Sequence, residues 1–362
     1  MIYIHVPFCK SRCHYCDFFS SVRLDLVQGF VDGVCAEAES RRGEMERAGV
    51  NTVYIGGGTP SQLTGGQLRQ IFGVLPELCR GAEVTIEVNP DDVTGDFVSG
   101  LLRTPVNRVS MGVQSLDDDV LARINRRHRA ADAVRAVGML REAGYTNLSL
   151  DLMYGLPGQT METWKRDVDG VLALDVPHLS AYSLQWEDGT VLSRMRDRGE
   201  VQEADEETSL AMYGYLADMT RKCGMEHYEI SNFCKPGMYS RHNSGYWRED
   251  AYVGLGPGAH SYDGHRVRRS NDADLESYCA GRVLYEEEHL TDDELYDEMV
   301  MKRLRTSAGI CIEEVPGEHV DYMLRMAEKH IRSGRMVLEE GRLRLSREGI
   351  FVSNDIMSDL ML

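Results

Sequence analysis

The sequence has little positive charge and no long hydrophobic run. Its 362 residues include 40 lysines and arginines against 58 aspartates and glutamates, which gives a net charge of −18. Affinity for nucleic acid depends on cationic side chains that neutralise phosphates, so this balance argues against a nucleic-acid partner. It also argues against docking on an anionic membrane surface. No stretch approaches the roughly 20 apolar residues that a membrane-spanning helix needs, so we expect no integral membrane segment.

The sequence also has neither the cysteine pattern of a disulfide framework nor the features of an export signal. The nine cysteines are an odd number scattered along a long chain, which is not the pattern of a disulfide-stapled protein. Residues 1–6 lack the basic and apolar regions of a signal peptide. We therefore expect a cytoplasmic protein with reduced thiols.

The first half of the chain alternates short apolar runs with amphipathic stretches. The runs typical of strands lie at 2–6, 52–55, 84–88, 108–113, 147–153 and 179–184, and the helical stretches at 25–48, 65–79, 117–143 and 160–174. Parallel strands need long crossovers, so this order predicts an α/β fold with helices outside a parallel sheet. A partial (β/α)6 TIM-like barrel is the favoured architecture, and a doubly wound sheet is the alternative.

The pattern changes after residue 205. A helix is predicted at 205–223, and a segment rich in Gly, Tyr, His and Asn follows at 225–265. Helical patterns at 274–281, 291–305 and 319–333 precede a predicted hairpin at 336–339 and 342–346, and then a last helix. We therefore predict a core at 1–225, a connecting segment at 226–284 and a small α+β, winged-helix-like domain at 285–362.

A C-x3-C-x2-C pattern of Cys9, Cys13 and Cys16 follows the first predicted strand. Three thiolates on one loop can hold three irons of a [4Fe–4S] cluster and leave the fourth iron open. Loops after strands are also where an α/β barrel places its chemistry. The positive charges of Lys10 and Arg12 are expected to lower the pKa values of the thiols. Zinc is the alternative, but it normally takes four protein ligands, and only one C-x2-C pair is present.

Glycines and polar residues follow the other predicted strands. The segment 56–60 reads GGGTP, and glycines there let the backbone approach a ligand closely. Glu87, Gln114 and Asp151 end three further strands. Because the carboxyl ends of neighbouring strands meet at one edge of a sheet, we expect these residues to share one cavity. Ordinary turns and helix caps remain the alternative for each of them.

These motifs resemble the radical SAM superfamily, whose members use S-adenosylmethionine (SAM). The wider set resembles the oxygen-independent coproporphyrinogen oxidase family over nearly the whole chain, in the segments YIHVPFC, YIGGGTPS, IEVNP, SMGVQS, NRRH, DLMYGLPGQT and GLGPGAHSY. The resemblance implies that SAM binds at the open iron and is cleaved to a 5′-deoxyadenosyl radical. It also implies a SAM-binding set of Tyr3, Tyr15, Gly57, Gly58, Thr59, Glu87, Gln114, Arg126 and Asp151.

Three features separate the chain from the oxidase and resemble the HemW heme-chaperone branch. The oxidase pattern continues C-x2-C-x-C, whereas Cys16 and Asp17 are followed here by Phe18. The long N-terminal extension of the oxidase does not precede Cys9. Residues 242–247 read HNSGYW and match HNxxYW, a motif that the resemblance associates with heme binding. It implies an iron ligand at His242, with the flat rings of Tyr246 and Trp247 beside a porphyrin.

Several alternatives remain open from the sequence. His5, His227 and His260 are further candidate heme ligands, and a packed histidine in an aromatic-rich turn is the ordinary explanation of the motif. The favoured function is a carrier that uses the cluster and SAM to deliver heme to an acceptor protein. The alternatives are oxidative decarboxylation of coproporphyrinogen III and another radical SAM reaction on a tetrapyrrole. Whether the protein is an enzyme, and its oligomeric state, are not predicted.

Overall fold

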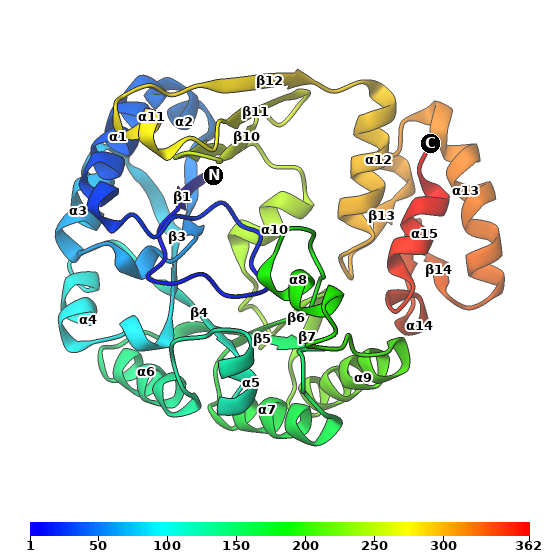
Figure 1. The fold of residues 1–362 in the computed structure, drawn as a ribbon. Coiled ribbons are helices and arrows are strands. Elements are labelled where there is room, and N and C mark those ends of the chain that lie inside the picture. Colours follow the sequence, from blue (N-terminus) through cyan, green and yellow to red (C-terminus); the bar gives the residue numbers. More distant parts are fainter.

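The computed structural model describes residues 1–362, except for the side chain of Ala48. Six parallel strands form the centre of a nine-stranded sheet that curves into an open barrel (Figure 1). They are β1 (Ile2–Val6), β2 (Val50–Gly57), β3 (Leu78–Val88), β4 (Arg108–Gln114), β5 (Asn147–Tyr154) and β6 (His178–Ser183). They lie side by side in the order of the chain, which is the order of a barrel and not of a doubly wound sheet. The predicted fold class is confirmed.

Helices cover the outside of this sheet (Figure 1). They are α1 (Val27–Ser40), α2 (Arg42–Ala48), α3 (Gly65–Val74), α4 (Gly95–Leu101), α5 (Asp118–Arg123), α6 (Ala130–Glu142), α7 (Met161–Ala173) and α9 (Glu206–Lys222). Three predicted helices were too long. The stretch 25–48 breaks at Arg41, and 65–79 ends at Val74 because β3 begins at Leu78. The stretch 117–143 breaks at Asn125, whose φ of 58° is left-handed.

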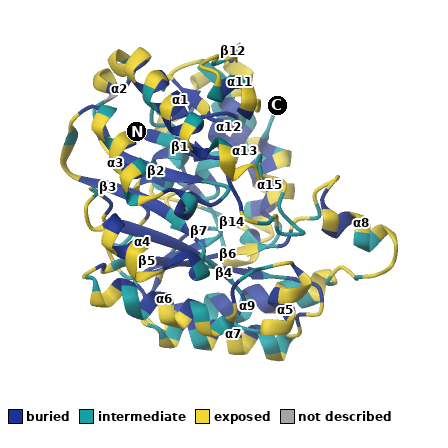
Figure 2. Ribbon diagram, turned by 60° about the vertical axis from the view of Figure 1, so that its left-hand side comes forward, coloured by how far each residue is buried: buried dark blue, intermediate teal, exposed yellow. Residues whose placement is uncertain are grey.

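Side chains alternate between the two faces of each strand, and this alternation separates the core from the barrel interior. In β4, Val109, Met111 and Val113 are buried against the helices, at 1% exposure or less. Arg108 and Ser110 lie on the opposite face and line the interior. Figure 2 shows the same contrast for the whole molecule, with buried strands inside and helices exposed on their outer sides. The apolar core therefore lies between sheet and helices, and the barrel interior carries polar and charged side chains such as Arg108 and Ser110.

The segment after residue 225 extends the sheet at both edges. β7 (Glu226–Glu229) and β8 (Asn232–Cys234) add antiparallel strands beside β6, and β9 (Val253–Leu255) pairs parallel with β1. Between them, α10 (Arg241–Trp247) packs against β2. β10 (His260–Tyr262), β11 (Val267–Asn271) and β12 (Tyr285–His289) form a separate sheet, and α11 (Leu275–Cys279) packs on α1. The predicted boundary at residue 285 thus falls at the start of a strand of this sheet.

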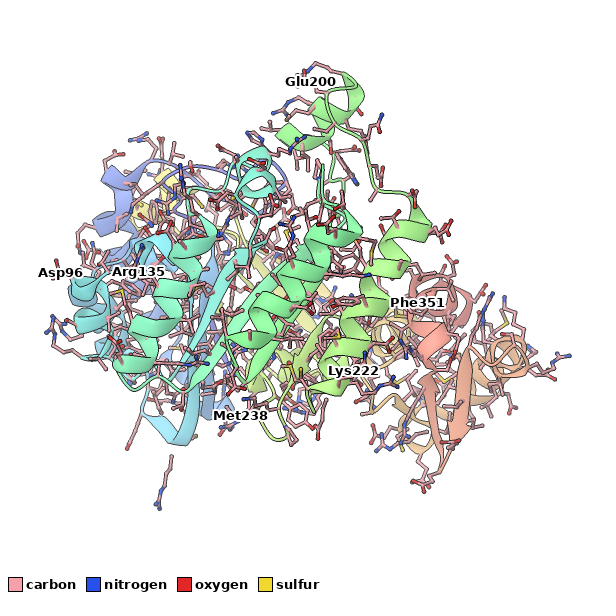
Figure 3. All side chains as sticks on the ribbon, turned by 90° about the horizontal axis from the view of Figure 1, so that it is seen from below. Asp96, Arg135, Glu200, Lys222, Met238 and Phe351 are labelled. Atoms are coloured by element: carbon pink, nitrogen blue, oxygen red, sulfur yellow. The ribbon has the colours of Figure 1, made fainter. Side chains whose placement is uncertain are left out.

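The C-terminal domain has its own apolar core. It contains α12 (Asp292–Arg303), β13 (Ile310–Cys311), α13 (Gly317–Arg332), the predicted hairpin of β14 (Met336–Glu339) and β15 (Arg342–Leu345), α14 (Arg347–Ile350) and α15 (Ser353–Leu360). Phe351 packs edge-on against Tyr213 of α9, at a centroid distance of 5.4 Å, and Figure 3 shows it at the junction with the core.

One further helix, α8 (Val191–Asp197), projects from the core beyond β6 (Figure 2). Its backbone reaches the cysteine loop, because the amide of Leu192 donates a hydrogen bond to the carbonyl of His14 at 2.8 Å. Among the described residues, no helix combines the length and the apolar character that crossing a membrane requires.

Candidate functional site

A cavity of about 440 Å³ lies inside the barrel at the carboxyl ends of its strands. This volume is typical of small-molecule sites, which span roughly 300–1,000 Å³. All predicted cluster and SAM residues except Tyr3 line it, namely Cys9, Cys13, Cys16, Tyr15, Gly57, Gly58, Thr59, Glu87, Gln114, Arg126 and Asp151. The structure therefore brings together residues that come from six different segments of the chain.

Tyr3 lies behind the cavity wall. Its hydroxyl is 3.1 Å from Nδ1 of His5, and its ring lies 6.2 Å from the ring of Tyr54. Tyr54 does line the cavity and donates a hydrogen bond to Glu87 at 2.6 Å. Tyr3 thus supports a residue of the cavity and does not itself face it.

The three cysteines of the loop line the cavity as free thiols. Thr59 Oγ1 donates to Cys9 Sγ at 3.4 Å, and Arg126 Nη1 donates to Cys13 Sγ at 3.5 Å. Among the described residues, no three His, Cys, Asp or Glu side chains are spaced to hold a single ion. A cubane cluster does not require that spacing, because each thiolate binds a different iron. Three thiolates that leave one iron open match the ligand count of a [4Fe–4S] cluster.

Of the predicted effects of Lys10 and Arg12 on the thiol pKa values, only the one of Arg12 on Cys9 is found, and burial outweighs it. Burial raises the pKa of Cys9 and raises the pKa of Cys16 to about 11, and the opposing effect of Arg12 on Cys9 is small. Lys10 instead forms an ion pair with Asp92 at 2.7 Å. At Cys9 and Cys16, removal of the thiol from water thus dominates the pKa.

Asp92 ties the cysteine loop to the loops that follow β2 and β3. Its buried carboxylate accepts hydrogen bonds from four side chains, those of Lys10, Ser61, Gln62 and Arg127. Because these donors come from different loops, a single carboxylate fixes the loops relative to one another. Removing one partner of such a buried ion pair strongly destabilises a protein, because it leaves an unpaired buried charge.

The glycines at the end of β2 permit close contact between protein segments. A Cβ at Gly58 would lie 2.9 Å from the carbonyl oxygen of Phe8, and a Cβ at Gly57 would lie 2.7 Å from the ring of His5. Gly57 also has a φ of 108°, which disfavours other residues. We predicted that these glycines would let a ligand approach the backbone closely. At these two positions, the segment that leads into Cys9 makes this close approach instead.

Two predicted SAM residues leave buried polar atoms without a partner. Gln114 ends β4 with a φ of 67°, where the register with β5 shifts. Its Oε1 has no hydrogen-bond partner among the described residues, and neither has Nε of Arg126. Arg126 Nη2 donates to Asn89 Oδ1 at 2.6 Å and to the carbonyl of Gly112. Strain and unpaired polar atoms are typical of ligand sites, so these residues fit a polar cofactor.

Glu87 and Asp151 are buried carboxyl groups with raised pKa values. Burial raises the pKa of Glu87 to about 7, although the Tyr54 hydroxyl and the amide of Gly57 donate hydrogen bonds to it. Burial likewise raises the pKa of Asp151 to about 6. Near pH 7, Glu87 can therefore donate or accept a proton in a hydrogen bond, which suits ribose hydroxyls or an ammonium group.

The sequence reasoning missed the deeper part of the cavity, which is lined by Tyr54, Arg108, Ser110, Ser180, Tyr182 and Asn243. Most of these residues lie within strands, and so does Asp151, which was predicted at a strand end but is followed by three more residues of β5. The available signal was the alternation of side chains, because Arg108 and Ser110 share a face with Gln114. Asn243 belongs to α10, and no sequence pattern indicated that it faces the cavity.

The HNxxYW helix directs its candidate heme residues to different places. His242 is completely buried, with Nδ1 2.8 Å from Thr52 Oγ1 and Nε2 3.1 Å from the hydroxyl of Tyr246. Burial lowers the pKa of His242 to about 3, so its ring is neutral. Trp247 instead lines a second cavity of about 500 Å³ between the core and the C-terminal domain. Both nitrogens of the leading ligand candidate are thus engaged in this conformation.

The other candidate histidines also have protein partners. His5 Nε2 lies 3.0 Å from the carbonyl oxygen of Phe19, behind the cysteine loop. His227 stacks on Phe233 at a centroid distance of 4.2 Å. His260 is exposed, with Nδ1 2.8 Å from the hydroxyl of Ser270.

Comparison with known proteins identifies relatives over nearly the whole chain. The model of the radical SAM superfamily matches residues 3–170, and that of the HemN C-terminal domain matches residues 290–352. The heme chaperone HemW of Lactococcus lactis is 36% identical over 86% of this chain and 83% of its own length. HemW of Bacillus subtilis is 32% identical over 98% of this chain and 97% of its own length.

A solved structure shares the fold. Coproporphyrinogen III oxidase (HemN) of Escherichia coli, described as a radical SAM enzyme, superimposes with a TM-score of 0.83 at 21% identity. The match covers 99% of this chain and 89% of the oxidase. At this level of identity, the similarity concerns the fold alone.

Proposed function

Because this chain belongs to the HemW family of radical SAM proteins, we propose that it binds heme in the cytoplasm and delivers it to an acceptor protein. One structural observation supports this proposal in addition to family membership. The helix with the HNxxYW motif, α10, contributes Asn243 to the wall of the cluster cavity, directly beside His242. A change of ligand in that cavity can therefore act on the helix that is proposed to bind heme.

The cofactors of this proposal are a [4Fe–4S] cluster and SAM. Cys9, Cys13 and Cys16 would hold the cluster. Tyr15, Gly57, Gly58, Thr59, Glu87, Gln114, Arg126 and Asp151 would surround SAM, with Tyr3 behind them. The chemistry that this pair supplies when bound is one-electron transfer to SAM. The chain's own contribution is to exclude water from a buried cavity and to place donors at the thiols.

Heme binding is proposed at His242, with Tyr246 and Trp247 as its aromatic neighbours. Burial keeps the imidazole neutral, which is the form that ligates iron. The hydroxyl of Tyr246 occupies Nε2 in the present conformation. We therefore propose that heme binding replaces this hydrogen bond with an iron–nitrogen bond and opens α10 away from β2.

Heme titration of the anaerobically reconstituted protein tests this proposal. His242→Ala should weaken heme binding and alter the heme absorption spectrum, whereas His260→Ala, which removes an exposed histidine outside α10, should match the wild type. An unchanged affinity and spectrum in His242→Ala would remove His242 as the ligand.

Complementation separates the carrier from the oxidase alternative. In a strain that lacks coproporphyrinogen oxidase, we expect this chain to leave anaerobic heme synthesis absent. Restored synthesis would contradict the carrier function and favour decarboxylation of coproporphyrinogen III.

A further inference from the structure

Arg108 is a buried cation without a hydrogen-bonded protein partner. It is the first residue of β4, it is 2% exposed, and its side chain lines the deep part of the cluster cavity. Among the described residues, none forms a hydrogen bond or an ion pair with its guanidinium group, and its Nε is completely enclosed. The head of this side chain therefore faces the cavity.

The carboxylates on the strands beside β4 are bound by other groups. Glu87 accepts hydrogen bonds from the Tyr54 hydroxyl at 2.6 Å and from a backbone amide at 3.1 Å. Asp151 accepts from Ser110 Oγ at 3.4 Å. Glu83 accepts from the first two backbone amides of α10, each at 3.1 Å. None of the three carboxylates lies within ion-pair distance of Arg108, although its charge lowers the pKa of Glu87 and Asp151 against the larger, opposite effect of burial.

Such an arrangement is unfavourable in the ligand-free protein. A guanidinium group remains protonated in proteins, and a buried charge is stabilised only when it is paired and hydrogen-bonded. Its planar, forked geometry matches a carboxylate through two parallel hydrogen bonds. Ser180 and Asn243 line the same cavity and supply further hydrogen-bonding groups. An entering carboxylate would therefore satisfy Arg108 without displacing an existing partner.

We propose that Arg108 is an anion subsite at the floor of the cluster cavity and binds the carboxylate of a ligand. Two ligands carry a carboxylate of this chemistry, a tetrapyrrole with propionate side chains and SAM with its methionyl carboxylate. The tetrapyrrole source rests on the function proposed above, whereas the SAM source does not. If the protein does not bind heme, the comparison of SAM with its decarboxylated analogue still tests the role of Arg108.

The test compares ligand pairs that differ in one carboxylate, on the full chain with its cluster reconstituted. One pair is SAM and its decarboxylated analogue, and the other is heme and its dimethyl ester. For at least one pair, the preference of the wild type for the acid should fall by about 10- to 100-fold in Arg108→Met. Arg108→Lys, which keeps the charge but not the fork, should retain part of it. Unchanged preferences for both pairs in Arg108→Met would overturn the proposal.

A second buried arginine provides the matched control for folding. The side chain of Arg41 is 5% exposed, forms ion pairs with Glu37 and Glu44, and donates to the carbonyl oxygen of Gly254 at 2.8 Å. Arg41→Met strands these partners and should lower the midpoint of thermal unfolding without ligand. Arg108→Met strands no partner and should not lower it. An equal loss in both variants would show that Arg108 is paired within the protein, and would overturn the proposal.

Discussion

Adding one methyl group at Gly58 should displace the cysteine loop. A Cβ there would lie 2.9 Å from the carbonyl oxygen and 3.0 Å from the amide nitrogen of Phe8. It would also lie 3.0 Å from the carbonyl oxygen of Val6, which accepts the Gly58 amide hydrogen bond at 2.8 Å. These are backbone atoms of the segment before Cys9, so they cannot rotate away. Overpacking of this kind costs about 1–3 kcal/mol, and we expect Gly58→Ala to lower the free energy of unfolding by that amount.

Gly66→Ala is the matched control. A Cβ at Gly66 would lie 3.7 Å from its nearest neighbour, Thr64 Oγ1, and the residue is in the first turn of α3. This variant should be up to about 1 kcal/mol more stable, because alanine loses less backbone entropy in a helix. Thermal denaturation of the cluster-free proteins measures both effects, at roughly 2–4 °C per kcal/mol for a domain of 150–250 residues. Iron and sulfide analysis after reconstitution then measures cluster assembly. A Gly58→Ala protein with wild-type unfolding and full iron content would show that the cysteine loop tolerates the added methyl group, contrary to this prediction.

Three further predictions concern single side chains of the site. Thr59→Val removes the hydroxyl that donates to Cys9 Sγ at 3.4 Å, so the reduction potential of the cluster should fall. A redox titration followed by electron paramagnetic resonance measures this potential. An unchanged potential would count against the prediction. Burial raises the pKa of Glu87 from its ordinary 4.5 to about 7, so the folded chain binds this proton more tightly than the unfolded chain. Stability of up to about 3 kcal/mol is therefore present at acidic pH and lost as the pH rises through 7; denaturation across this range should give a flatter profile for Glu87→Gln, and identical profiles would disprove the assignment. Tyr246→Phe frees Nε2 of His242 from its hydrogen bond, so heme affinity should rise in a titration; an equal or weaker affinity would argue against His242 as the ligand.

The six barrel strands could be predicted because each contains a short apolar or alternating run that is separated from the next by a stretch of helical length. The break in the stretch 117–143 could not be predicted from the same signal. Apolar residues continue on both sides of Asn125, although α5 and α6 pack into two separate apolar clusters. The left-handed turn at Asn125 nevertheless ends α5 and carries Arg126 into the cavity. Asparagine tolerates this conformation better than most residues, which was the available clue.

The short strands after residue 225 depend on partners that are distant in the sequence. β9 has three residues and exists because it pairs with β1 at the other end of the chain. Local propensity contains no information about such a pairing. The same limit applies to His242, whose burial depends on Thr52, 190 residues away. Strand-end residues were predictable because topology alone brings them together, whereas Arg108 required knowledge of which face of β4 points inward.

The most direct test of the account is cluster assembly in Cys13→Ala, with Cys223→Ala as control. Cys13 lines the cavity, whereas Cys223 is an exposed thiol at the end of α9. After anaerobic reconstitution, the wild type and Cys223→Ala should each bind about four iron and four sulfide ions per chain, and SAM should change their electron paramagnetic resonance spectrum. Cys13→Ala should lose this SAM-responsive cluster. A Cys13→Ala protein that keeps a full cluster and its response to SAM would contradict the account.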